Sequence, residues 1–124
     1  MRWSDYPNFT EFEFACKCNC GAKKVSKRFM DMLQEARNIA GIPFRIGSGC
    51  RCVKHNETVG GVSDSAHLST DILKCKAVDI SIRNDREKFI IVKALLEAGF
   101  TRLGVYDTWI HADNSSSKDQ KVMW

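Results

Sequence analysis

Hydrophobic residues recur every three or four positions in two stretches of the chain, which is the spacing of an amphipathic helix. The first stretch, SKRFMDMLQEARNIAG, begins at Ser26, a typical helix N-cap, and ends at Gly41. The second, NDREKFIIVKALLEAG, begins at Asn84 and ends at Gly99, and Glu87 completes a capping-box-like pair with Asn84. The pattern therefore predicts two main helices.

Shorter stretches predict strands, because apolar residues alternate in them or run together between turn residues. They are FRIGSG, AVDISI, TRLGVY, TWIHAD and KVMW. Between Cys50 and Cys75 there is little periodicity, so we expect a long functional loop there. Trp109 and Trp124 are expected to pack in the core. The order of elements predicts an α+β fold with a small, mostly antiparallel sheet, and 124 residues suit a single domain spanning 1–124.

Charge and hydropathy indicate which kinds of molecule the chain can bind. The net charge is +4, and the lysines and arginines are spread along the chain, so we expect no nucleic-acid partner. A mild positive charge suits an acidic polymer such as an anionic cell wall. No apolar run approaches the ~18 residues of a membrane span. The first residues, MRWSDYPNFTEFEF, contain no apolar signal region, so we expect a chain that is cytoplasmic as synthesised. We also expect the protein to be a monomer.

Three polar residues stand in unusual places. His67 lies in a loop rich in Gly and Ser, and Asp79 lies within a predicted apolar strand, where an unpaired charge is costly. His111 alternates with apolar residues, so its side chain faces away from theirs. Two imidazoles and one carboxylate suit Zn²⁺ and leave a fourth position open, as in catalytic zinc sites. The alternative is a chance combination of surface histidines and a capping aspartate, because the spacing is no compact motif.

Several segments resemble the M15 family of zinc peptidases, which includes D-Ala-D-Ala carboxypeptidases and the peptidoglycan endopeptidases used as phage endolysins. They are EFEFACKCNCG, RIGSGCRCVKHNETVGGVSDSAH, KAVDI, LLEAGFTRLGVYDTWIHAD and KVMW, in family order from about Phe12 to Trp124. The resemblance implies a hedgehog-like, DD-peptidase-like fold with zinc bound by His67, Asp79 and His111. It also implies hydrolysis of peptidoglycan stem peptides at the bacterial cell wall, as a DD-carboxypeptidase or an endopeptidase.

The spacing of the expected ligands departs from the family pattern H-x-x-G-x-A-x-D. Asp79 follows His67 by twelve residues, and STDILKC looks like a local insertion of about five residues. Asp71, four residues after His67, has the H-x-x-x-D spacing of lysostaphin-like peptidases and is the rival ligand. We favour Asp79, because KAVDI keeps the strand context that directs a carboxylate inwards.

The general base is not fixed by the resemblance. Many family members carry Glu or Asp three residues before the last histidine ligand, where this chain has Thr108, which has no useful basicity. Asp113 shares a strand face with His111 and is the first candidate, either as base or as a residue that orients the histidine. Asp107 is the second candidate, although a regular strand would turn it to the opposite side. For both, a hydrogen-bonded turn residue is the alternative.

Two residues are placed near the substrate by the resemblance. Arg51 occupies the family's SG-x-R position, and its planar guanidinium could hold a carboxylate or a developing oxyanion; a salt bridge that packs the loop is the alternative. Ser65 is similar to the family serine that hydrogen-bonds substrate. The missing acid at Thr108 and the altered loop after His67 favour a second hypothesis. In it, the chain is a catalytically weak or inactive module that binds cell wall or a partner protein.

Six cysteines are many for a chain without a visible secretion signal, so we interpret them as thiols or metal ligands before disulfides. One alternative is a second, structural zinc site drawn from Cys16, Cys18, Cys20, Cys50, Cys52 and His55. The C-x-C spacing is tighter than that of usual zinc ligands, which favours packed thiols or a local crosslink between the two segments. Cys75 is expected to be a lone reactive thiol.

Overall fold

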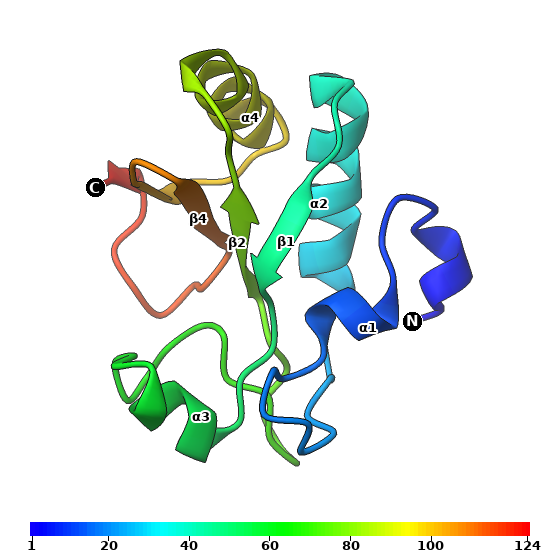
Figure 1. The fold of residues 1–124 in the computed structure, drawn as a ribbon, viewed down its shortest axis with the longest axis vertical. Helices are drawn as coiled ribbons and strands as arrows, with labels where there is room; N and C mark the ends of the chain where they lie inside the picture. Colours follow the sequence, from blue (N-terminus) through cyan, green and yellow to red (C-terminus); the bar gives the residue numbers. More distant parts are fainter.

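The stretches of strand pattern form one sheet in the computed structural model, which describes residues 1–124 (Figure 1). The strands are β1 (Arg45–Ser48), β2 (Ala77–Ser81), β3 (Arg102–Val105), β4 (Trp109–Asp113) and β5 (Val122–Met123). Their order is β1-β2-β4-β3-β5, and all neighbouring pairs are antiparallel except β3 with β5. The predicted α+β fold with a small, mostly antiparallel sheet is confirmed.

The two predicted main helices are also present. The helices are η1 (Trp3–Asp5, a 3-10 turn), α1 (Glu11–Phe14), α2 (Lys27–Ala40), α3 (Val53–Thr58) and α4 (Asp85–Glu97). The side chain of Ser26 accepts a hydrogen bond from the backbone N–H of Phe29, and Gly41 ends α2 with a left-handed φ of 67°. None of the helices combines the length and hydrophobicity needed to cross a membrane.

The start of α4 differs from the prediction. Asn84 caps the helix by accepting a hydrogen bond from the backbone N–H of Glu87, as expected. The Glu87 carboxylate does not return to Asn84, so the predicted capping box is wrong. It accepts hydrogen bonds from the backbone and guanidinium of Arg83 and from the guanidinium of Arg45, at 2.8–3.0 Å. Because Arg45 begins β1, Glu87 ties α4 to the edge of the sheet.

The hydrophobic core forms between the sheet and the two long helices, which lie side by side. Ile80 of β2 and Ile110 of β4 are fully buried in it, and the rings of Phe29 and Phe100 meet edge to face at 5.8 Å. Successive strand residues point to opposite faces. Residues that alternate with this buried set, such as Asp79, therefore face away from the helices.

The long segment between Cys50 and Cys75 is not loop throughout, as the sequence pattern predicted, because it contains α3. This helix is under two turns long, too short to show a hydrophobic period. Figure 1 shows it at the opposite end of the sheet from α4. After α3, the backbone N–H of Lys76 donates to the carbonyl of Ala66 at 2.9 Å, which brings the two ends of the intervening segment together.

The Glu87 carboxylate should make stability depend on pH. The guanidinium groups of Arg83 and Arg45 and the backbone N–H of Arg83 lower the pKa of Glu87 from 4.5 to about 2. A lowered pKa means that the charged form favours the folded state. The contribution is thus complete above about pH 5 and is lost as the pH falls towards about 2.

We expect Glu87→Gln to lower the free energy of unfolding at about pH 7, measured by urea denaturation, and the difference from the parent to shrink on acidification to about pH 3. Glu97→Gln is the matched control, because Glu97 pairs only with Lys93 on the exposed face of α4 and should contribute little. An equal loss at both pH values would contradict this role for Glu87.

Candidate metal centre and substrate cleft

The pairing of β2 with β4 places Asp79 directly opposite His111. Both side chains leave the sheet on the face turned away from the helices, and the β-carbons of an opposed pair lie only about 5 Å apart. His67 reaches the same place from the segment after α3. It is fixed there by its carbonyl group, which accepts a hydrogen bond from the backbone N–H of Arg51 at 2.8 Å.

One oxygen of Asp79 lies between the two imidazole rings. Oδ1 is 3.0 Å from Nδ1 of His111 and 3.3 Å from Nε2 of His67. The outer nitrogen of His67 is 2.7 Å from the carbonyl oxygen of Gly49, and that of His111 is 2.7 Å from Oδ2 of Asp113. A carbonyl or an ionised carboxylate can only accept, so each outer nitrogen carries a hydrogen. Each inner nitrogen faces Oδ1 of Asp79, to which it donates a hydrogen bond when protonated. Without that proton it presents a lone pair at the same point, which is the arrangement of histidine metal ligands.

The surrounding charges keep Asp79 ionised. Burial opposes ionisation, but the hydrogen bonds and charges of His111 and His67 outweigh it and lower the pKa of Asp79 well below its usual range. Nη2 of Arg51 adds a salt bridge to Oδ2 at 3.3 Å. Burial likewise opposes charging of His111, but its hydrogen bonds to Asp113 and Asp79 raise its pKa. The pair of carboxylates thus favours a positive charge at this point, either a proton or a metal cation.

The three groups fit a zinc ion in number and kind. One nitrogen from each histidine and one carboxylate oxygen of Asp79 all lie within 4.8 Å of one another. Catalytic zinc is bound by three such protein ligands and keeps a further position open. Here His67, Asp79 and His111 line a cleft of about 440 Å³, from which a further ligand can enter. The residues present could therefore hold zinc.

The rival aspartate lies elsewhere. Asp71 is exposed, next to Ile72, whose side chain is 91% exposed, in the segment that loops out between Ala66 and Lys76. The only hydrogen bond of Asp71 in the structure uses its backbone carbonyl, which accepts from Nζ of Lys24 at 3.4 Å. The structure thus brings His67 together with Asp79 and not with Asp71.

Asp113 holds His111 rather than facing the cleft as a free base. It is 2% exposed, and its Oδ1 accepts hydrogen bonds from Nε of Arg102 at 2.7 Å and from the backbone N–H of Ser115 at 3.0 Å. Burial opposes ionisation, but these donors and His111 lower the pKa of Asp113. With both oxygens occupied, its geometry is that of a group that orients a histidine ligand.

The second candidate for the base is not in the cleft. Asp107 is exposed in the turn between β3 and β4, beside Thr108, and neither side chain lines the cleft. The only carboxylates that line it are those of Asp79 and Asp113, and both are engaged by other side chains. The cleft therefore contains no uncommitted carboxylate.

Both residues expected near the substrate do line the cleft. The guanidinium of Arg51 donates to Oγ of Ser48 and to Oδ1 of Asn56, each at 3.3 Å, in addition to its salt bridge with Asp79. Both expectations for Arg51 are thus compatible, because it packs the loop and still borders the cleft. The hydroxyl of Ser65 accepts a hydrogen bond from the backbone N–H of His67 at 3.2 Å.

The aromatic wall of the cleft was not expected from the sequence. Trp109 and Trp124 were predicted to pack in the core, but they are 38% and 47% exposed and line the cleft with Tyr106. Trp109 stacks on Tyr106 with ring centroids 4.2 Å apart, and Nε1 of Trp124 donates to the Tyr106 hydroxyl at 2.8 Å. The sequence did contain a signal for Trp109. Side chains two residues apart on a strand point to the same face, so Trp109 shares the face of His111 on β4.

Two cations of the cleft were also missed. Arg102 is the buried partner of Asp113, and its guanidinium carbon lies 5.2 Å from the ring centroid of Trp124. Lys118, in the segment between β4 and β5, borders the opening with its ammonium 3.5 Å from Oδ1 of Asp64. Nothing in the local sequence of either residue indicates the cleft.

Comparison with known proteins agrees with this site. No curated protein matches the chain. The sequence profile of a family described as peptidase M15 matches residues 7–113, a range that contains His67, Asp79, His111 and Asp113. M15 peptidases are generally zinc dependent, in keeping with the two-histidine, one-aspartate group. The match covers most of the chain and confirms the resemblance inferred from its motifs. The chain therefore belongs to the peptidase M15 family.

Proposed function

We propose that this chain is a zinc-dependent peptidase that hydrolyses peptide bonds in peptidoglycan stem peptides, with His67, Asp79 and His111 as the zinc ligands. The observation that carries the proposal is the convergence of two imidazole nitrogens and one carboxylate oxygen, within 4.8 Å, at a cleft of an M15-family chain. The activity would be that of a DD-carboxypeptidase or an endopeptidase, exerted at the bacterial cell wall as by a phage endolysin.

Each neighbouring residue has a defined task in this proposal. When bound, zinc supplies a Lewis acid that polarises a peptide carbonyl and activates water. Asp113 keeps the proton of His111 on Nε2, so that Nδ1 remains a ligand, and the Gly49 carbonyl does the same for His67. Arg51 borders the cleft with a charged planar group that suits a carboxylate or a developing oxyanion.

The shape and charge of the cleft suit a short, acidic peptide. Lys118 and Arg51 provide positive charge, which would attract the terminal carboxylate of a stem peptide. Tyr106, Trp109 and Trp124 provide an apolar wall for small aliphatic side chains such as that of alanine. These features support binding of a peptide end at the cleft and do not distinguish carboxypeptidase from endopeptidase activity.

The direct test is mass spectrometry of purified stem peptides incubated with zinc-loaded protein. We expect a new fragment with the parent protein and a loss of at least about 100-fold in rate with His111→Ala, which removes one ligand. His55→Ala is the matched control, because His55 lies on α3 and does not line the cleft. Cleavage that persists in His111→Ala would contradict the proposed centre.

The choice of aspartate ligand can be tested by metal content. We expect Asp79→Asn to lower zinc affinity strongly in equilibrium dialysis, because it removes the anionic ligand between the two imidazoles. Asp71→Asn should leave the affinity unchanged, because Asp71 is exposed and lies outside the group formed by the two rings and Asp79. The reverse result would make Asp71 the ligand.

The role of Asp113 can be separated from that of a base. We expect Asp113→Asn to weaken zinc binding about 10–100-fold, because the carboxylate that orients His111 is lost. A base would instead be revealed by a lower kcat with unchanged zinc affinity. Asp107→Asn, in the exposed turn, is the control and should change neither quantity.

One observation favours a second candidate function. Because no uncommitted carboxylate lines the cleft, proton transfer from water lacks an obvious acceptor among the side chains. The alternative is a module of the same fold that binds cell wall or a partner protein with weak or no catalysis. Zinc-loaded, folded protein that sediments with peptidoglycan and yields no fragment would support this alternative.

A further inference from the structure

We propose that Cys16, Cys18, Cys20 and Cys52 form a second metal site, which binds zinc through four thiolates and has a structural role. The site is separate from the cleft, whose lining includes none of these residues. It is also independent of the proposed peptidase activity, because a binding module of the same fold would use it equally.

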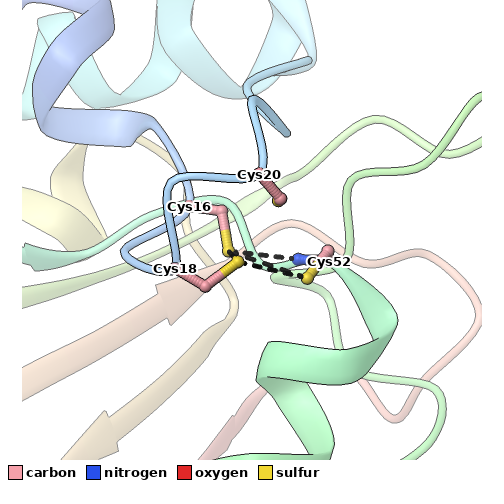
Figure 2. A group of neighbouring side chains, drawn as sticks. All are labelled: Cys16, Cys18, Cys20 and Cys52. Atoms are coloured by element: carbon pink, nitrogen blue, oxygen red, sulfur yellow. Dashed lines mark hydrogen bonds between the residues drawn. The ribbon is translucent and has the colours of Figure 1, made fainter.

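Four sulfur atoms from distant parts of the chain converge at this place. Figure 2 shows three cysteines on one loop after α1 and the fourth, Cys52, immediately before α3. All four sulfur atoms lie within 4.8 Å of one another. Four cysteines are one of the usual ligand sets of closed, structural zinc sites, in which no position is left open for substrate.

The sulfur–sulfur distances fit a shared metal ion better than a disulfide. Sγ of Cys16 is 3.4 Å from that of Cys18 and 3.9 Å from that of Cys52, and Cys18 and Cys52 are 3.6 Å apart. With zinc–sulfur bonds of about 2.3 Å, a tetrahedron has sulfur–sulfur edges of about 3.8 Å. A disulfide requires about 2.05 Å, and all six cysteines are free in the structure.

The backbone conformation of the loop allows cysteines with C-x-C spacing to reach one metal ion, although this spacing is tighter than that of usual zinc ligands. Asn19 and Gly21 both adopt left-handed φ angles, of 63° and 88°. The backbone N–H of Cys16 donates to the carbonyl of Ala22 at 2.8 Å, and that of Asn19 to the carbonyl of Cys16 at 3.1 Å. The loop is therefore curled and not extended, so its three side chains turn towards a common point.

Backbone donors are directed at the sulfur atoms. The N–H of Cys52 lies 3.5 Å from Sγ of Cys16, and the N–H of His55 lies 3.3 Å from Sγ of Cys52. Such donors stabilise negative charge on sulfur, as expected around a thiolate that binds a metal. Packing of neutral thiols does not account for the cluster, because Cys18 and Cys20 are exposed and bury little apolar surface.

The other cysteines and His55 do not belong to this site. Cys50 and Cys75 are buried, and neither belongs to the group of four sulfur atoms. Cys75 is fully buried and its thiol donates to the carbonyl of Ala77, so the expectation of a lone reactive thiol is wrong. His55 contributes only its backbone N–H.

The cluster would hold a functional part of the chain in place. Residues 49–52 connect β1 to α3 and carry the Gly49 carbonyl that binds His67, and the guanidinium of Arg51. The backbone N–H of Cys50 donates to the carbonyl of Phe14 at 2.8 Å, beside the cysteine loop. A metal that joins this loop to Cys52 would therefore hold residues 49–52 in place, and with them the Gly49 carbonyl and the Arg51 guanidinium.

Cobalt binding distinguishes this site from the cleft, because only thiolate ligands give an intense charge-transfer absorption in the near ultraviolet. On titration of reduced, metal-free protein with Co²⁺, we expect this band in the parent and in His111→Ala, which lacks a cleft ligand. Metal binding displaces the four thiol protons to solvent, so the band should weaken at low pH. Zinc should abolish the band by displacing cobalt.

Cysteine variants test which thiolates bind the metal. The double variant Cys18→Ser and Cys52→Ser should lose the band and bind one zinc ion fewer per chain, and Cys20→Ser, at an exposed position, should weaken the band. Cys75→Ala is the matched control and should keep the band, because Cys75 lies outside the cluster. A folded parent without the band, or an intact mass that reveals a disulfide among the four, would overturn the proposal.

Discussion

The candidate site depends on one half-buried carboxylate on an inner strand of the sheet. Asp79 lies on β2, opposite His111 of β4, and is compensated by His67 and Arg51. A buried charge without partners would cost several kcal/mol, so the strand pairing and the polar cluster depend on each other. A slip of one residue between β2 and β4 would turn Asp79 towards the helices and bury a bare charge in the core.

The second constraint is the close approach of the N-terminal segment to residues 49–52. A β-carbon on Gly49 would lie 2.9 Å from the α-carbon of Phe14, so only glycine allows the two backbones to meet there. This contact presents the Gly49 carbonyl to His67. The N-terminal residues, although distant from His67 in sequence, thus help to position this candidate ligand through their contact with Gly49.

The cleft combines strong organisation of the candidate metal ligands with few free polar groups. His67 and His111 are each fixed by a partner on the outer nitrogen, and Asp113 is itself fixed by Arg102 and Ser115. Such a connected set holds its geometry before any ligand arrives, which favours tight binding. The same hydrogen bonds occupy both oxygens of Asp113. Asp113 therefore orders the centre but is not free to act as a general base.

The sequence by itself determined the main helices, the strands and the residue types of the centre. Hydrophobic periodicity and capping residues are local properties, so Ser26, Gly41 and the apolar neighbours of Asp79 sufficed to predict α2 and β2. The tertiary structure decided which aspartate joins His67, that Asp113 orients His111, and that four cysteines meet. These facts depend on strand register and on how loops close between residues far apart in sequence, and no local pattern encodes such distances.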